Sequence, residues 1–360
     1  MKRRGVLIGI NGFGFYWRKT FIPYVANVEG KLEVVGAYNR SEKGFDLVQE
    51  DLGLRRDQCY TDLRQMLEET RPDFVMIIVP PQVRESVIDL ALEYDCDIIT
   101  EKPLAMDMEA CVRIARKVEQ RGKKLCVTMT HRMARDKQTL LKEIQSGAHG
   151  PVANITGSLT VARQDADYED TWRQHMDYYY MFDAAIHQLD ILRALSGSNA
   201  RKLYCKGWAP EWAAFKQVAA YNVIVEMENG VIGNYQVSSC SAANLNWWYQ
   251  DYIRVDCRDS VLVLDAQKLT AHRGRQISWD AKMNITRENI DTDIPLLGGE
   301  RWTNSLLLSQ FIDWINGGEP PVTTVNDNLY SMAMLFAAIE SIKTGREIDV
   351  QALYDAACAK

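Results

Sequence analysis

The sequence predicts a doubly wound α/β domain followed by a large, mainly antiparallel α+β domain. Three observations support this fold class. The chain has 360 residues, more than one hydrophobic core usually organises. Its first third alternates short apolar runs with segments of helical spacing. After residue 150, long β-type runs follow one another directly. We therefore predict two domains, residues 1–128 and residues 129–360.

Five apolar runs predict the strands of the first domain. Strands that are covered on both faces read as continuous apolar runs, and their alternation with helices implies a parallel sheet. Helical spacing lies between the runs, as in Val87, Leu90, Ala91 and Tyr94. The predicted strands are residues 5–10, 32–38, 74–79, 97–100 and 124–128.

The second domain is predicted as one open sheet with flanking helices. Glu228, Asn229 and Gly230 supply a hairpin turn between two of its strands. The predicted helices are residues 179–196, 306–316 and 328–344. The predicted strands are residues 152–161, 202–208, 220–227, 230–238, 252–257 and 260–264.

The composition argues against several classes of partner. There are 42 Lys and Arg residues against 48 Asp and Glu residues, and a net charge of −6 disfavours binding to nucleic acid. The eight cysteines form no C-x-x-C pair and no zinc spacing, so we expect reduced thiols and no metal. No apolar run is long enough to span a bilayer, and the basic start lacks a signal-peptide cleavage site. We expect a cytoplasmic protein.

The first predicted strand leads into the glycine-rich turn GINGFG. A dinucleotide-binding turn uses glycine for a tight bend, for close approach of the pyrophosphate, and for packing of the helix on the strand. A register that begins at Gly9 has Asn11 at the second position, whereas one that begins at Gly12 has Trp17 at the third. We prefer Gly12, because it leaves a full strand before the turn. A glycine-rich turn without a cofactor is the competing interpretation. The predicted cofactor residues here are Gly12, Phe13 and Gly14.

The second predicted strand ends at Asn39 and Arg40. An acidic side chain at this point binds the adenosine ribose and repels a 2′-phosphate. Asn39 does not repel a phosphate and Arg40 can pair with one, so both are predicted to bind the cofactor. The pattern favours NADP(H) over NAD(H), and a turn with a solvated arginine is the competing interpretation.

Two further motifs carry groups that can do chemistry. Glu101 and Lys102 follow a predicted strand, at the sheet edge that faces the ligand crevice in such folds, and Pro103 restricts the lysine backbone. Asp183 and His187 lie on one stripe of a predicted helix together with Asp190. An amphipathic helix with a solvated polar edge is the alternative. The preceding aromatic run, residues 178–180, favours a pocket.

Together these motifs resemble the glucose–fructose oxidoreductase / inositol dehydrogenase / rhizopine-catabolism (Gfo/Idh/MocA) family over nearly the whole chain. Glu101-Lys102-Pro103 is similar to the hallmark tripeptide of that family. The loop at Val79 and Pro80 is similar to its loop near the nicotinamide ribose. Further matches are Trp172-Arg173, then Asp183, His187 and Asp190 in the D-x-G-x-H-x-x-D pattern, and the closing segments at Phe311 and Ser341.

The resemblance implies a Rossmann-type first domain and an NAD(P)-dependent oxidoreductase. Such an enzyme would act on a secondary hydroxyl or keto carbon of a sugar, glycoside or cyclitol, as a homodimer or homotetramer. An NAD-dependent redox-neutral glycosidase and a non-enzymatic sugar- or cofactor-sensing regulator are the alternatives. By resemblance the catalytic groups are Lys102, Asp183 and His187, and which of Lys102 and His187 takes the proton stays open. The remaining implied residues are Val79, Pro80, Glu101 and Lys102 for the cofactor, and Arg132, Trp172, Arg173 and Tyr180 for the substrate.

The chain departs from the family pattern at several positions. In the preferred register Trp17 replaces the third glycine, and Tyr178, Tyr179 and Tyr180 stand where glycines are usual. Ala185 replaces the glycine of the helix motif. Aromatic side chains suit the apolar face of a sugar ring, so we expect a glycoside or a bulky cyclitol.

Overall fold

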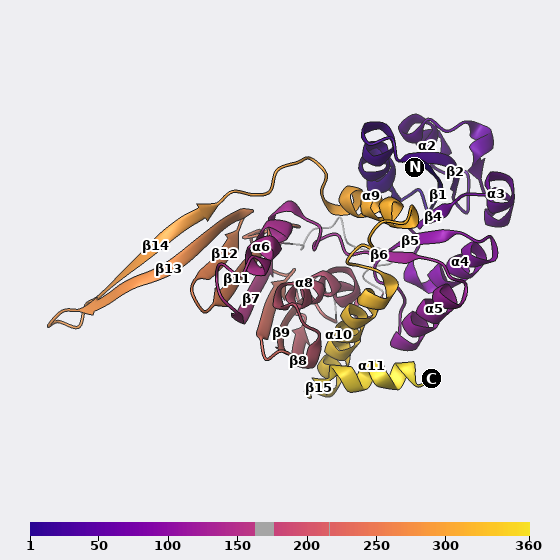
Figure 1. Cartoon of the computed structure of the whole chain (residues 1–360). Coiled ribbons are helices and arrows are strands. Elements are labelled where there is room, and N and C mark those ends of the chain that lie inside the picture. The colour runs from indigo at the N-terminus through magenta and orange to yellow at the C-terminus, as the bar shows by residue number, and fades with distance from the viewer. Residues whose placement is uncertain (163–175, 216) are drawn as a thin grey trace. The chain divides into compact units, whose positions relative to one another are not determined.

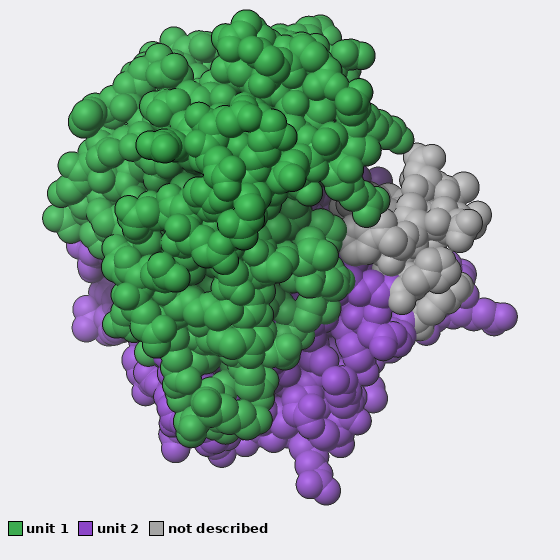
Figure 2. Space-filling model, turned by 90° about the vertical axis from the view of Figure 1, so that its right-hand side faces the viewer, with its two compact units in different colours: residues 1–133, 301–332, 356–360 green, residues 134–300, 333–355 purple. Residues whose placement is uncertain are grey.

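The computed structural model describes residues 1–162, 176–215 and 217–360 (Figure 1). The chain divides into two compact units (Figure 2). Unit 1 comprises residues 1–133, 301–332 and 356–360, and unit 2 comprises residues 134–300 and 333–355. The boundary predicted at residue 128 treats each domain as one contiguous segment, whereas both units are assembled from separated segments.

Unit 1 contains the predicted parallel sheet, which has six strands. Their order is β3-β2-β1-β4-β5-β6, and neighbouring strands run parallel. The order reverses between β1 and β4, and in doubly wound sheets this point opens the ligand crevice at the carboxyl ends of the strands. The strands are β1 (Arg3–Ile8), β2 (Leu32–Tyr38), β3 (Cys59–Tyr60), β4 (Phe74–Ile77), β5 (Asp97–Glu101) and β6 (Leu125–Thr128).

Helices cover this sheet because their apolar stripes match its buried faces. In α5, for example, Cys111, Ile114, Ala115 and Val118 are buried, and the carboxylate of Asp107 caps the helix by accepting from the Ala110 N–H. The helices before residue 133 are α1 (Gly14–Tyr16), η1 (Trp17–Phe21), η2 (Tyr24–Val28), α2 (Phe45–Leu52), η3 (Arg56–Gln58), α3 (Leu63–Thr70), α4 (Pro81–Glu93) and α5 (Met108–Gln120).

The core of unit 1 also contains a helix from late in the sequence. Leu307, Leu308 and Phe311 of α9 (Thr303–Ile315) belong to the same buried cluster as Leu7 of β1. The rings of Phe311 and Phe74 pack edge to face with centroids 5.4 Å apart. This packing explains why unit 1 is discontinuous in sequence.

Unit 2 contains a nine-stranded, mainly antiparallel sheet, as predicted. The order is β14-β13-β12-β11-β7-β10-β9-β8-β15, and β7 and β10 form a parallel pair within it. Side chains alternate between a buried and an open face, as in β9, where Val223 and Val225 are buried and Ile224 is exposed. The strands are β7 (Val152–Thr160), β8 (Ala200–Trp208), β9 (Ala220–Met227), β10 (Ile232–Ser238), β11 (Tyr252–Cys257), β12 (Val261–Asp265), β13 (Lys268–Trp279), β14 (Ile285–Ile294) and β15 (Ile348–Asp349).

Strands β13 and β14 form a long hairpin that runs out beyond the rest of this sheet (Figure 1). Near its tip, Ile277, Trp279 and Ile285 are all exposed. The sequence analysis did not predict this hairpin, because its outer part buries neither face and therefore shows no apolar alternation.

The remaining helices include the one that carries the predicted Asp and His motif. The sequence predicted one regular helix over residues 179–196. The structure shows a π-helical turn, η5 (Met181–Ala185), followed by α8 (Ile186–Ser196). The others are α6 (Arg135–Gln145), α10 (Val325–Thr344) and α11 (Val350–Cys358). Within the described residues, no helix has the length and apolar character needed to cross a membrane.

Candidate functional site

The glycine-rich turn follows β1 at the carboxyl edge of the parallel sheet. Gly9 has φ +94°, and a Cβ there would lie 2.3 Å from the carbonyl oxygen of Ile78. Gly14 starts α1, and a Cβ there would lie 2.2 Å from the carbonyl oxygen of Gly9. Gly9 thus meets the need for a tight bend, and Gly14 meets the need for close helix packing. The geometry supports the register that begins at Gly9, with Asn11 second, rather than the preferred one that begins at Gly12.

The loop after β2 is tied to this turn. The side-chain amide of Asn11 donates to the Lys43 carbonyl at 3.0 Å. The amide of Asn39 donates to the carbonyls of Ser41 and Lys43 at 2.8 and 3.3 Å, while Arg40 is exposed. Asn11 stands in the second glycine position. Its side chain therefore connects the turn to the segment that was predicted to bind the adenosine ribose.

A buried carboxylate marks the end of β5. Glu101 accepts from the indole N–H of Trp17 and from the hydroxyl of Thr128, each at 2.7 Å, and from the amide of Asn304 at 3.3 Å. Burial raises the pKa of Glu101, and the hydrogen bonds from Thr128 and Trp17 oppose that rise. In the register that begins at Gly9, Trp17 does not stand at the third glycine position, and its indole is a buried donor to Glu101.

Arg84 joins two predicted cofactor loops and was missed by the sequence analysis. Its guanidinium donates to the carbonyl of Val79 at 2.6 Å and also to the carbonyl of Pro103. Burial lowers the pKa of Arg84 to about 10, and Glu101 opposes this shift. Arg84 shares the buried face of α4 with Ile88. An arginine at an apolar position of the helical pattern is therefore the sequence signal that could have identified this residue.

Two other predicted cofactor residues lie in the same loops. Pro80 is at the N-cap of α4. Lys102 is half-buried, and the peptide bond that follows it is cis.

The predicted substrate residues are placed in different surroundings. Arg132 is buried in unit 1, where its guanidinium donates to the Val322 carbonyl at 3.2 Å and pairs with Asp327 at 3.4 Å. Tyr180 is buried in unit 2, and its ring stacks on Phe215 with centroids 5.4 Å apart. Trp172 and Arg173 lie outside the described residues.

The Asp and His motif spans the junction between η5 and α8. Asp183 is half-buried in the π-helical turn, His187 lies in the first turn of α8, and Asp190 follows one turn later. His187 and Asp190 are both about 1% exposed, which excludes a solvated polar edge for these two residues. Single π-helical turns within helices are frequent at functional sites.

Trp248 is a neighbour of His187 that the sequence analysis did not identify. The two rings meet edge to face, with centroids 5.6 Å apart and an interplanar angle of 86°. Trp248 lies 61 positions later in the chain, in the segment before β11, so no local pattern links the two residues.

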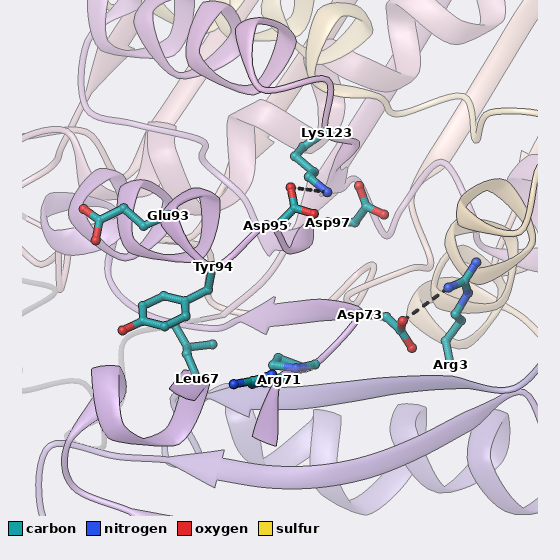
Figure 3. Close-up of a pocket in the computed structure, with 10 residues that line it drawn as sticks. Arg3, Leu67, Arg71, Asp73, Glu93, Tyr94, Asp95, Asp97 and Lys123 are labelled. Atoms are coloured by element: carbon teal, nitrogen blue, oxygen red, sulfur yellow. Dashed lines mark hydrogen bonds and ion pairs between the residues drawn. The ribbon is translucent and has the colours of Figure 1, made fainter. Parts of the chain in front are cut away.

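A cavity of about 540 Å³ lies at the opposite, amino edge of the parallel sheet (Figure 3). Arg3 pairs there with Asp73 at 3.2 Å, and Lys123 pairs with Asp95 at 2.7 Å. The cavity contains none of the predicted site residues. Among residues 1–162, 176–215 and 217–360, no group of three His, Cys, Asp or Glu side chains is arranged to hold a metal ion.

Comparison with known proteins gives two family matches along the chain. Residues 6–129 match the model described as oxidoreductase family, NAD-binding Rossmann fold, and residues 138–261 match the GFO/IDH/MocA C-terminal domain. A protein of Sinorhizobium fredii named y4oX, described as uncharacterized, is 36% identical over 353 residues, 96% of this chain and 94% of that protein.

More distant relatives carry enzyme names. The scyllo-inositol 2-dehydrogenase (NAD(+)) of Bacillus subtilis is 23% identical over 98% of each chain. The D-apiose dehydrogenase of Paraburkholderia graminis is 23% identical over 97% of this chain and 90% of that protein. Among solved structures, an Agrobacterium radiobacter oxidoreductase in complex with NAD+, L-tartaric acid and magnesium has a TM-score of 0.77 at 20% identity, covering 98% of this chain and 100% of the other. This last likeness shows the shared fold.

Proposed function

Because this chain belongs to the Gfo/Idh/MocA family of NAD-dependent oxidoreductases, we propose that it oxidises or reduces a sugar, glycoside or cyclitol. The hydride would move between the nicotinamide and a secondary hydroxyl or keto carbon. The observation that carries this proposal is the geometry at the carboxyl edge of the parallel sheet. The Gly9–Gly14 turn and Glu101, next to Lys102, follow β1 and β5 at that edge. Relatives named as inositol and apiose dehydrogenases support the substrate class.

The glycine-rich turn fits a dinucleotide. The backbone packs too closely at Gly9 and Gly14 to admit a Cβ, and the tip at Gly12 and Phe13 is exposed. When bound, NAD(P) supplies the acceptor or donor of the hydride. We assign the pyrophosphate to the turn, the adenosine ribose to Asn39 and Arg40, and the nicotinamide end to Val79, Pro80, Glu101 and Lys102. The exposed guanidinium of Arg40 supports a preference for NADP(H).

The proposed catalytic groups are Lys102, Asp183 and His187. Oxidation of a secondary alcohol requires a base for the hydroxyl proton, and histidine has its ordinary pKa near neutrality. We assign proton transfer to His187, orientation of the imidazole or of a substrate hydroxyl to Asp183, and stabilisation of the developing alkoxide to Lys102. The proposed substrate contacts are Arg132, Trp172, Arg173 and Tyr180.

We further propose a homodimer or homotetramer in the cytoplasm. The open face of the unit 2 sheet exposes Tyr204, Ile224 and Ile232, and this apolar surface supports association between copies. All eight cysteines are free thiols, which supports a reducing compartment.

One experiment separates this proposal from its alternatives. Purified protein would be denatured and the released cofactor identified by mass spectrometry. Sugars, glycosides and cyclitols would then be screened with NAD+ and NADP+ for formation of reduced nicotinamide. An oxidoreductase gives net reduction. A redox-neutral glycosidase releases sugar without it, and a regulator binds its ligand without turnover.

The site assignment is tested with the substrate found in that screen. His187→Ala and Lys102→Ala are each expected to lower kcat by about 10²–10⁴-fold, the usual contribution of general acid–base groups. Exposed Lys142→Met in α6 is the control and should retain full activity. Full turnover by both alanine variants would refute the assignment.

A further inference from the structure

Unit 2 contains a buried ionic cluster that the proposed reaction does not use. Lys137 of α6 is only 2% exposed. Its ammonium nitrogen lies 2.9 Å from a carboxylate oxygen of Asp136, 3.2 Å from one of Asp251, and 2.7 Å from the carbonyl oxygen of Tyr249. The ammonium thus donates hydrogen bonds to Asp136 and to the Tyr249 carbonyl, and it forms an ion pair with Asp251.

The cluster continues from Asp251 to the helix that carries His187. The other carboxylate oxygen of Asp251 accepts from the hydroxyl of Tyr235 at 2.7 Å and from the side-chain amide of Gln188 at 3.5 Å. Gln188 in turn accepts from the hydroxyl of Tyr221 at 3.2 Å. Burial raises the pKa of both tyrosines well above the ordinary value, so both hydroxyls remain donors at neutral pH.

These contacts involve a chain neighbour of His187 and a ring that packs against its imidazole. Gln188 is the next residue on α8, so its hydrogen bonds with Asp251 and Tyr221 hold the turn of the helix that carries His187. Trp248, whose ring packs edge-on against the imidazole, directly precedes Tyr249, whose carbonyl Lys137 binds. Tyr249 has φ +69°, a left-handed conformation that a non-glycine residue adopts only when its surroundings hold it.

We propose that the buried Lys137–Asp251 pair is a positioning element for His187. The inference rests on the proposed function, in which His187 transfers the substrate proton. Through Asp251 and Gln188 the pair fixes α8, and through the Tyr249 carbonyl it fixes the Trp248 ring against the imidazole. A displacement of about 1 Å at a reacting group can cost about 100-fold in rate, so a network that holds both the helix turn of His187 and the ring against its imidazole should affect turnover.

Stability alone does not account for a buried cluster of this kind. Buried ion pairs are often no more stabilising than apolar residues of similar volume, because desolvation offsets the attraction. The specific arrangement here is a lysine that connects α6 to the segment of Tyr249 and Asp251, which lies more than 100 positions later in the chain. It fixes geometry rather than adding hydrophobic contact, which is what a positioning role requires.

The first test observes His187 without any turnover. The imidazole C–H resonances of the five histidines would be recorded by NMR, with His187→Asn used for assignment. Lys137→Met is expected to move the His187 resonance and its titration midpoint, because the Trp248 ring shifts relative to the imidazole. Lys142→Met, an exposed lysine on the same helix, should move neither.

A gentler variant covers the case in which Lys137→Met does not fold. Tyr235→Phe deletes one hydroxyl from Asp251 and keeps both charges and the aromatic ring. It is expected to move the His187 resonance in the same direction by a smaller amount. An unmoved resonance in folded Lys137→Met or in Tyr235→Phe would overturn the inference, whatever the enzyme turns over.

The second test is kinetic and uses a double-mutant cycle. Lys137→Met should lower kcat about tenfold or more and shift the pH profile, with the KM for the cofactor unchanged. If Lys137 acts through Trp248, adding Lys137→Met to Trp248→Phe should cost much less than it costs in the native background. A native kcat in Lys137→Met, or fully additive losses, would overturn the inference. A wild-type protein that neither oxidises nor reduces any sugar, glycoside or cyclitol would instead refute the proposed function.

Discussion

The indole N–H of Trp17 donates a 2.7 Å hydrogen bond to the carboxylate of Glu101. Both groups are buried, and 84 positions separate them in the sequence. The bond links the helical segment that follows the glycine-rich turn to the end of β5, directly before Lys102. It therefore connects the proposed cofactor-binding turn to the segment of one proposed catalytic group, within unit 1.

Removal of this donor gives the first prediction. Trp17→Phe keeps an aromatic ring but leaves Glu101 with one donor fewer, so the pKa of Glu101 should rise further. We expect a loss of about 1–3 kcal/mol in the free energy of unfolding, the usual cost of an unsatisfied buried polar group, measured by urea denaturation. Trp212→Phe is the control. It removes the hydrogen bond from the Trp212 indole to the Cys240 carbonyl, but Trp212 is 67% exposed. That change should stay within about 0.5 kcal/mol.

The second prediction concerns the close contact at Gly14. Gly14→Ala places a Cβ 2.2 Å from the Gly9 carbonyl oxygen, so the backbone must shift. We expect about 1–3 kcal/mol of destabilisation and a raised KM for NAD(P), measured by thermal denaturation and steady-state kinetics. Gly298→Ala adds a methyl group in open space and should be neutral. Equal behaviour of the two variants would contradict the register that begins at Gly9.

The third prediction tests the choice between NAD and NADP. Arg40→Ala removes the exposed guanidinium proposed to pair with the 2′-phosphate. Hydrogen bonds to charged groups contribute about 1.5–3 kcal/mol, so the KM for NADP+ should rise about tenfold or more. The KM for NAD+ should stay within about twofold, because NAD+ lacks that phosphate. Arg55→Ala, at an exposed arginine in the same unit, is the control. A parallel rise for both cofactors would argue against the NADP preference.

The fourth prediction is a pH dependence at the surface of unit 1. Hydrogen bonds from Arg113, assisted by Lys117, lower the pKa of Glu85 to about 2, against an ordinary value of 4.5. Because the folded-state pKa is depressed, the stabilisation is fully present above pH 4.5 and is lost as the pH falls toward 2.

This surface cluster is partly screened by solvent, so we expect an effect of about 1 kcal/mol. Urea denaturation across that pH window should show a smaller decline for Glu85→Gln than for the native protein. Glu119→Gln, at an exposed carboxylate of α5, should follow the native curve. An unchanged slope in Glu85→Gln would refute the assignment.

Much of the fold could be predicted because burial leaves a clear pattern. The strands of the parallel sheet are covered on both faces, so β4 is apolar and buried throughout, and β2 and β5 are mostly apolar. Strand β3 has only two residues, which is too short for any pattern. The outer part of the β13–β14 hairpin is exposed on both faces, so apolar periodicity could not reveal it.

The sequence could indicate those parts of the candidate site in which functional side chains lie within one local motif. The tripeptide at Glu101 lies at the predicted strand end, and the burial of His187 and Asp190 favours the pocket interpretation. The roles of Trp17, Arg84 and Trp248 depend on contacts with distant segments, which no local spacing encodes. The structure favours the other glycine register because β1 ends at Ile8 and the bend starts at Gly9, whereas the predicted apolar run continues to Ile10.

The discontinuity of unit 1 has a consequence for synthesis on the ribosome. Leu307 and Phe311 of α9 complete the core of that unit, yet residues 134–300 are translated first. At roughly 5–20 residues per second, that stretch takes about 8–30 s. During this interval the nascent parallel sheet lacks part of its cover and exposes apolar surface to chaperones. A fragment that ends near residue 133 would lack α9, and part of its core would stay exposed. A stable fragment of the dinucleotide-binding unit therefore needs residues 301–332 joined to residues 1–133.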